Sequence, residues 1–139
     1  MKTFFPINVH SNKVTYEIQF GNIERASHFN TSWDAAKFEV CAHKWADISD
    51  GSYGVSLLND CKYGHSAEGS TLCLTLLKCA YPNPHADKGE HTFTYSLYPH
   101  LDDYRTGGTV QEAYLLNRPL TSMTVASRKG VLNEKYYFI

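Results

Sequence analysis

Residues 14–20 read Val-Thr-Tyr-Glu-Ile-Gln-Phe, and this short stretch decides the class of fold. Its apolar members alternate strictly with polar ones: Val14, Tyr16, Ile18 and Phe20. Because successive side chains of a β-strand point to opposite faces, the alternation predicts a strand with one buried and one solvated face. Gly21 and Asn22 follow with the chemistry of a turn, so we expect the strand to end there.

Similar segments extend in both directions from this strand. Strand-like alternation or short apolar runs occupy residues 37–40, 53–58, 71–78, 91–98 and 131–139. Residues 109–117 differ, because their apolar positions recur at helical spacing between a Gly-Gly pair and Pro119. The pattern predicts a mainly β protein, an antiparallel β-sandwich with one short helix. We expect residues 1–139 to form one such domain or a fragment of a larger one, and the packing of residues 121–139 stays open.

Composition and charge restrict the classes of partner. The chain has 139 residues, enough for one domain, and 42% of them are hydrophobic while 19% are charged. This balance favours an ordered core over disorder. The net charge of −1 provides no general attraction to nucleic acid or to an anionic membrane surface. No run approaches the roughly 18 apolar residues that span a bilayer. We therefore expect neither a nucleic-acid nor a membrane partner.

The cysteines and the first residues indicate the compartment. Four cysteines at positions 41, 61, 73 and 79 have spacings that match neither a zinc finger nor a disulfide scaffold. Polar residues interrupt the N-terminal segment, so it does not resemble a secretory signal. Both features predict reduced thiols and a cytoplasmic protein. They also fit a chain cut from the middle of a longer one.

No local motif predicts a metal site. The seven histidines are scattered, and none forms the His-x-x-x-His pair of a helical metal site. His85-x-Asp87 and His100-x-Asp102 are two weak chelating pairs, and both lie in segments rich in turn residues. We interpret these four residues as solvated surface groups.

Catalytic motifs are also missing from the sequence. Three carboxylate pairs have the residue types of a glycosidase acid and nucleophile: Asp47 with Asp50, Asp87 with Glu90, and Asp102 with Asp103. Each pair lies beside turn residues, so turn formation is the competing interpretation. Lys62 next to Cys61 favours a thiolate, but no histidine is placed by motif as its base. We predict no catalytic residue in this chain.

Aromatic residues near loops allow two interpretations. Trp33, Trp45, Tyr53 and Tyr63 lie in or beside predicted loops. Exposed aromatic rings stack on sugars, and such a surface is typical of a carbohydrate-binding module. Most Trp and Tyr side chains, however, pack in cores or interfaces. The sequence leaves both interpretations open.

A longer pattern resembles a known family. The segments that carry the resemblance are residues 16–21, 30–40, 42–47, 53–64, 91–100 and 107–114, in this order. Together they resemble the C-terminal β region of glycoside hydrolase family 38 α-mannosidases, and the bacterial and cytosolic branch above all. The resemblance covers most of residues 6–120.

The resemblance implies a division of labour within a much larger enzyme. Such an enzyme is a retaining exo-α-mannosidase that removes terminal α-linked mannose from oligosaccharides. Its catalytic domain, outside this chain, carries the aspartate nucleophile and a divalent metal, usually zinc. The implied partners of this chain are therefore that catalytic domain and a mannose-containing oligosaccharide. The implied role is to complete the sugar pocket and support the catalytic domain, with no cofactor bound here and no activity of the isolated chain.

The resemblance also implies where this chain contacts the sugar. In the family, a loop of the β region reaches the catalytic pocket, and the matching substrate-binding positions are Asn59, Asp60, Lys62, Tyr63 and Gly64. Asn59 and Asp60 would leave a buried strand as a turn, and Gly64 would adopt a backbone conformation closed to other residues. A purely structural turn is the alternative for this loop. For the whole chain, the alternatives are a stand-alone carbohydrate-binding module and a scaffold without sugar contact.

Overall fold

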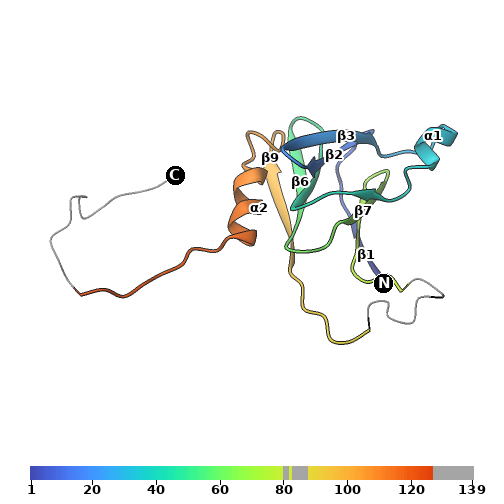
Figure 1. Ribbon diagram of the computed structural model, residues 1–139. Coiled ribbons are helices and arrows are strands. Elements are labelled where there is room, and N and C mark those ends of the chain that lie inside the picture. Colours follow the sequence, from blue (N-terminus) through green and yellow to red (C-terminus); the bar gives the residue numbers. More distant parts are fainter. Residues whose placement is uncertain (80–81, 83–87, 127–139) are drawn as a thin grey trace.

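The alternating stretch forms strand β2 (Lys13–Ile18) in a computed structural model that describes residues 1–79, 82 and 88–126 (Figure 1). Two residues later the backbone of Phe20 turns with a φ of 58°, and strand β3 begins. Around β2 the described chain forms β1 (Lys2–Pro6), β3 (Gly21–Ala26), α1 (Ser32–Ala35), β4 (Val40–Cys41), β5 (Trp45–Ser49), β6 (Tyr53–Asn59), β7 (Gly64–Glu68), β8 (Thr71–Thr75), β9 (Tyr95–Leu101) and α2 (Thr109–Asn117).

The strands form two antiparallel sheets. One sheet has the order β1-β8-β7-β4, and the other has the order β3-β2-β5-β6-β9. All pairings between neighbouring strands are antiparallel. The predicted antiparallel β-sandwich is therefore confirmed. The helix predicted over residues 109–117 is confirmed as α2.

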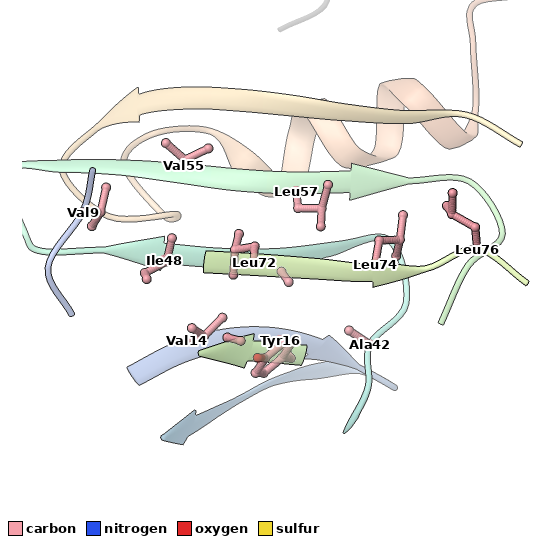
Figure 2. Close-up of a cluster of buried hydrophobic side chains, with 12 residues drawn as sticks. Val9, Val14, Tyr16, Ala42, Ile48, Val55, Leu57, Leu72, Leu74 and Leu76 are labelled. Atoms are coloured by element: carbon pink, nitrogen blue, oxygen red, sulfur yellow. The ribbon is translucent and has the colours of Figure 1, made fainter. Parts of the chain in front are cut away.

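Apolar side chains from both sheets meet in one core (Figure 2). Tyr16, Ile48 and Leu57 point inward from the five-stranded sheet, and each is at most 2% exposed. Leu72 and Leu74 of β8 face them from the other sheet. Removing this apolar surface from water is the main force that holds the two layers together.

The outer face of the five-stranded sheet is covered as well. Helix α2 packs on β5 and β6 from this side (Figure 1). Thr15 and Glu17, expected on a solvated face, are each only 7% exposed. Glu17 accepts hydrogen bonds from Lys44, from Nζ at 2.8 Å and from the backbone N–H at 2.6 Å. The expectation of a solvated face was wrong, because alternation records side-chain polarity and not what later packs on it.

The strand predicted at residues 37–40 was wrong for most of its length. Thr31 caps the short helix α1, since its Oγ1 accepts a hydrogen bond from the Asp34 N–H at 3.1 Å. The Lys37 N–H then bonds to the Asp34 carbonyl, which continues the turn. Of the four residues predicted as a strand, only Val40 lies in one, and it pairs with His65 at the edge of the smaller sheet. The hydrogen bonds of the helix cap therefore determine the local structure more strongly than the strand preference of a four-residue alternation.

The other predicted strands differ mainly at their ends. The strand at 53–58 is confirmed as β6, and that at 71–78 is the shorter β8. The strand at 91–98 begins only at residue 95 and continues through Pro99 to residue 101. A proline is tolerated there because β9 is an edge strand. The predicted strand at 131–139 lies outside the described residues.

Among the residues that the structure describes, no helix is long and apolar enough to cross a bilayer.

Candidate functional site

The candidate sugar loop starts at Asn59, the last residue of β6. Its side chain is 1% exposed, donates from Nδ2 to the His43 carbonyl at 2.9 Å, and accepts the Lys62 N–H at Oδ1 at 2.6 Å. The Asn59 N–H donates to the Lys44 carbonyl, and the Asn59 carbonyl accepts from Nδ2 of Asn117. Asn59 therefore holds the loop against the segment before β5 and the end of α2.

Asp60 is exposed and fixed from the other side of the loop. Its Oδ2 accepts the Thr94 N–H at 3.0 Å, and its own N–H donates to the Thr94 carbonyl. Partial burial acts to raise the pKa of Asp60, but hydrogen bonds from Cys61 and Thr94 outweigh it and hold this pKa below its usual range. Asp60 thus offers an ionised carboxylate at neutral pH.

Cys61 does not have the properties of a nucleophile. The hydrogen bond to Asp60, partial burial and the charge of Asp60 raise the pKa of its thiol, and the opposite influence of Lys62 is smaller. The hypothesis that Lys62 favours a thiolate was therefore wrong. The reason is that the carboxylate of Asp60 accepts a hydrogen bond from the protonated thiol, a contact that adjacency in sequence does not reveal.

Lys62 and Tyr63 complete the surface of the loop. The Lys62 ammonium lies 4.9 Å from the centre of the Phe93 ring, a cation–π contact. The Tyr63 ring is 56% exposed and meets the His43 ring edge to face at 5.5 Å. The Tyr63 carbonyl accepts the Ala42 N–H, so the backbone is fixed while the phenol remains available.

Gly64 is required for space and not for an unusual backbone conformation. It begins strand β7 and is absent from the residues with a positive φ. A Cβ at this position would lie 2.8 Å from Oε1 of Glu39 and 3.0 Å from Cβ of Thr75. The predicted left-handed conformation was therefore wrong. The neighbouring strand and the Glu39 carboxylate approach too closely for a side chain.

The substitution Gly64→Ala is expected to lower the free energy of unfolding by about 1–3 kcal/mol, the range for overpacked sites. Glu39 cannot move aside easily, because its carboxylate bonds to Thr75 and pairs with Lys2 at 3.5 Å. Urea unfolding of the chain followed by circular dichroism measures the change. The matched control is Gly21→Ala, where an added Cβ has no neighbour within 4 Å. Equal effects at both glycines would contradict this account.

A cavity of about 300 Å³ lies beside the loop. The structure brings Asn59, Asp60 and Tyr63 to its wall, whereas Lys62 and Gly64 lie outside it. The wall also includes residues that sequence reasoning missed: His43, Lys44 and Asn117. Hydrogen bonds with Asn59 hold all three there, and the spacing of residues in the sequence does not predict such bonds. His43 and Lys44 lie within the resembling segments, whereas Asn117 lies outside them.

Lys44 lines this cavity, but its ammonium is engaged elsewhere. It bonds to Oε1 of Glu17 at 2.8 Å and lies 4.7 Å from the centre of the Tyr114 ring, and neither of these residues lines the cavity. The Asp60 carboxylate therefore gives the wall an anionic acceptor, which suits a ligand with hydroxyl groups that donate hydrogen bonds.

The weak metal pairs and carboxylate pairs are tested only where the structure describes their residues. Among the described residues no three His, Cys, Asp or Glu side chains lie close enough to hold a metal ion. His85 and Asp87 lie outside the described residues. Asp50 and Asp103 each accept backbone N–H groups two and three residues ahead, as turn formers do. The competing interpretation as turns is confirmed for these two carboxylates.

Asp47 and His100, expected in exposed turns, are instead buried together. His100 Nε2 lies 2.7 Å from Oδ1 of Asp47, and the two side chains are 2% and 1% exposed. Ser56 donates to the same Oδ1 at 2.7 Å, and its hydroxyl meets that of Thr109 at 2.6 Å. The network joins β5, β6, β9 and α2. The surface assignment was wrong because α2 covers this face.

The four candidate aromatic residues divide between the two interpretations. Trp45 is 2% exposed and stacks on Tyr104 at 4.9 Å, so the packing interpretation is confirmed for it. Trp33, on α1, is 79% exposed, and Tyr53 is 40% exposed. Of the two tryptophans, only Trp33 therefore presents an open ring face to a sugar.

Comparison with known proteins gives a consistent set of relatives. Residues 1–85 match the family described as "Glycosyl hydrolases family 38 C-terminal domain". The chain is 50% identical over 128 residues to human "Alpha-mannosidase 2C1". The match covers 91% of the chain and 12% of that protein. It is 52% identical over 101 residues to "Alpha-mannosidase" of Saccharomyces cerevisiae, covering 72% of the chain and 9% of that protein.

A solved structure shares the fold. The crystal structure of an α-mannosidase from Enterococcus faecalis V583 superposes with a TM-score of 0.79 at 21% identity, over 94% of this chain and 16% of that one. The chain therefore spans about an eighth of the length of its curated relatives and a similar share of this bacterial structure.

Proposed function

This chain belongs to the family of glycosyl hydrolase family 38 C-terminal domains, and from that premise we propose that it is the β-sandwich part of a longer α-mannosidase. The observation that carries the proposal is the 50% identity to human "Alpha-mannosidase 2C1" over 91% of the chain. At that level of identity we expect the role of the segment to be retained as well as its fold. The complete protein would hydrolyse terminal α-linked mannose from oligosaccharides.

The chemistry of bond cleavage belongs to the part of the enzyme outside this chain. The described residues contain no cluster of three metal-binding side chains. We propose that the catalytic domain of the complete protein holds zinc or another divalent metal, together with the nucleophile. That domain is the proposed partner of this sandwich, and a mannose-containing oligosaccharide is the proposed ligand between them.

The loop from Asn59 to Gly64 is the proposed contribution to the sugar pocket. Asn59 is buried and bonded to His43 and Lys62, so it positions the loop. Gly64 leaves room for the strand behind it. Asp60, Lys62 and Tyr63 then present a carboxylate, an ammonium and a phenol to the hydroxyl groups of a bound sugar. These groups lie on a backbone held by hydrogen bonds, which lowers the entropy lost on binding.

We further propose that the parent enzyme belongs to the bacterial and cytosolic branch and works in the cytoplasm. The relatives in human and yeast, together with the bacterial neighbour, support the branch. Cys41 and Cys61 are exposed thiols, which persist in a reducing compartment.

The substitution Asp60→Asn in the complete enzyme tests the loop. We expect kcat/KM for an aryl α-mannoside to fall about tenfold or more, because a charged acceptor contributes about 1.5–3 kcal/mol to a hydrogen bond. The matched control Glu68→Gln removes another exposed carboxylate and should leave kcat/KM unchanged. The isolated chain should not turn over the substrate.

Other outcomes distinguish the alternatives. Unchanged kinetics of a folded Asp60→Asn enzyme would reduce the loop to a structural turn and the chain to a scaffold. Saturable binding of mannobiose to the isolated chain, lost in Trp33→Ala, would instead favour a stand-alone carbohydrate-binding module. Metal-dependent turnover by the isolated chain would contradict the division of labour itself.

A further inference from the structure

A second, larger cavity lies on another part of the sandwich and shares no residue with the sugar loop. Its volume is about 490 Å³, and its walls come from β2, β5 and the segment that precedes α2. Six of the lining residues are aspartate, glutamate, lysine or arginine: Lys13, Glu24, Asp47, Asp50, Asp103 and Arg105. Most of the wall is polar, which argues against an apolar occupant.

One buried oxygen atom at this cavity lacks a partner. Asp47 is 1% exposed, and its Oδ1 accepts from Ser56 and faces His100. Its Oδ2 is buried and has no hydrogen-bond partner among the described residues. Asp47 lines the cavity, whereas Ser56 and His100, the two partners of its Oδ1, do not. A buried carboxylate oxygen without a hydrogen bond is costly, so the site favours a donor.

The charges of the wall determine which donor fits. Four carboxylates, one lysine and one arginine line the cavity, together with His10. The lysine and the arginine are each paired already, Lys13 with Glu24 at 2.8 Å and Arg105 with Asp103 at 3.3 Å. This pairing leaves Asp47 and Asp50 without a basic partner in the cavity. Hydrogen bonds from Ser52 and Tyr53 hold the pKa of Asp50 below its usual range, so this carboxylate is ionised at neutral pH.

We propose that this cavity binds an ammonium or guanidinium group that donates a hydrogen bond to Oδ2 of Asp47 and is attracted by the carboxylate of Asp50. A cation with several N–H groups supplies both the missing donor and the missing positive charge. A neutral polyol would supply only the donor. Two sources share this chemistry, a lysine or arginine side chain from the rest of the longer protein and a free alkylamine.

Titration of the chain with agmatine, followed by ¹H–¹⁵N correlation spectra, tests the proposal. Agmatine carries both cationic groups on a flexible stem, and xylitol serves as a neutral polyol of similar size. We expect saturable shifts of the amide signals of Asp47 and its neighbours with agmatine, at an affinity about tenfold above that for xylitol. Because the attraction is electrostatic, added salt should weaken it.

Variants that remove a charge from the cavity should change its affinity for agmatine in opposite directions. Asp47→Asn should weaken agmatine binding about tenfold, and Asp50→Asn, at an exposed site where folding is not at risk, about threefold. Lys13→Gln should strengthen binding, because it frees Glu24 from its partner. Asp60→Asn, in the sugar loop, is the control and should change nothing. These variants separate the cation site from the proposed mannosidase function, since they do not require activity.

Measurements on the complete protein distinguish the two sources of the cation. If a side chain of another segment fills the cavity, agmatine gives saturation-transfer signals with the isolated chain and none with the complete protein. If a free amine is the ligand, both give signals. No saturable shift at the cavity, equal shifts with xylitol, or an affinity that ignores Asp50→Asn and Lys13→Gln would overturn the proposal and leave water as the occupant.

Discussion

The substitution His100→Ala is expected to lower the free energy of unfolding by about 3–5 kcal/mol, because it removes a large buried side chain together with the hydrogen-bond partner of a buried carboxyl group. Asp47 would keep a buried carboxylate with only Ser56 as a donor. The loss includes the space left by the ring, which sits between Gly54 and Gly107. A Cβ on Gly107 would lie 2.5 Å from Nδ1 of His100, so the ring and the two glycines fit together.

Chemical denaturation of the chain and its variants measures this loss. The matched control is His10→Ala, an exposed histidine whose removal should change the free energy of unfolding by less than about 0.5 kcal/mol. In a double-mutant cycle, the variant that combines Asp47→Ala with His100→Ala should lose less than the two single losses together, because neither partner is then left alone. Additive losses would show that the pair is not coupled.

Acidification is expected to destabilise the chain through His65. This side chain is 1% exposed, between the sheets, with its ring edge to face against Tyr16. Burial lowers the pKa of His65 from 6.5 to about 4, and the hydrogen bond to the Tyr63 carbonyl opposes this only in part. Nδ1 lies 3.2 Å from that carbonyl, while Nε2 has no partner among the described residues. The folded state therefore holds a neutral ring.

The sign of the effect follows from proton binding. Between pH 6.5 and about 4 the unfolded chain protonates this histidine and the folded chain does not. Stability is thus fully present above the unfolded pKa and is lost as the pH falls toward the folded pKa. Each pH unit corresponds to about 1.36 kcal/mol, so the contribution lost is about 3 kcal/mol. Below pH 4 this group causes no further loss.

The variant His65→Phe isolates this contribution, because it keeps a ring but removes the titration. Urea unfolding from pH 7 to pH 4 should show a steeper fall for the natural chain than for the variant. His10→Ala, as before, should leave the fall unchanged. Parallel curves for the natural chain and His65→Phe would contradict the burial of a neutral histidine.

How much of the fold follows from sequence depends on what covers each strand. β2, β6 and β8 were found because apolar residues alternate or cluster in them. β5 was missed, since Trp45, Ala46, Asp47 and Ile48 are buried on both faces and show no alternation. Its outer face is covered because Tyr104 and helix α2, more than 50 residues away in sequence, pack there. Local patterns do not contain that information.

The candidate site shows the same limit of prediction from local sequence. The loop was located through its resemblance to a family, and Asn59 was correctly placed at the end of a strand. Three properties of the loop could not be predicted. Asn59 is bonded inward, Asp60 raises the pKa of Cys61, and Gly64 allows close packing. They depend on contacts outside the loop, among them those with Thr94, Glu39 and Thr75. Those contacts come from other segments of the chain, so they required the structure.

The anchoring of Asn59 to both α2 and the approach to β5 has a practical consequence for redesign. Since the main chain is clamped at one end by these bonds and at the other by β7, residues 60, 62 and 63 can be varied together in a combinatorial library without rebuilding the scaffold. If the proposed sugar contact is correct, such a library would change the chemical groups that meet the sugar on an unchanged backbone. Conversely, a small displacement of α2 would move the proposed sugar loop with it.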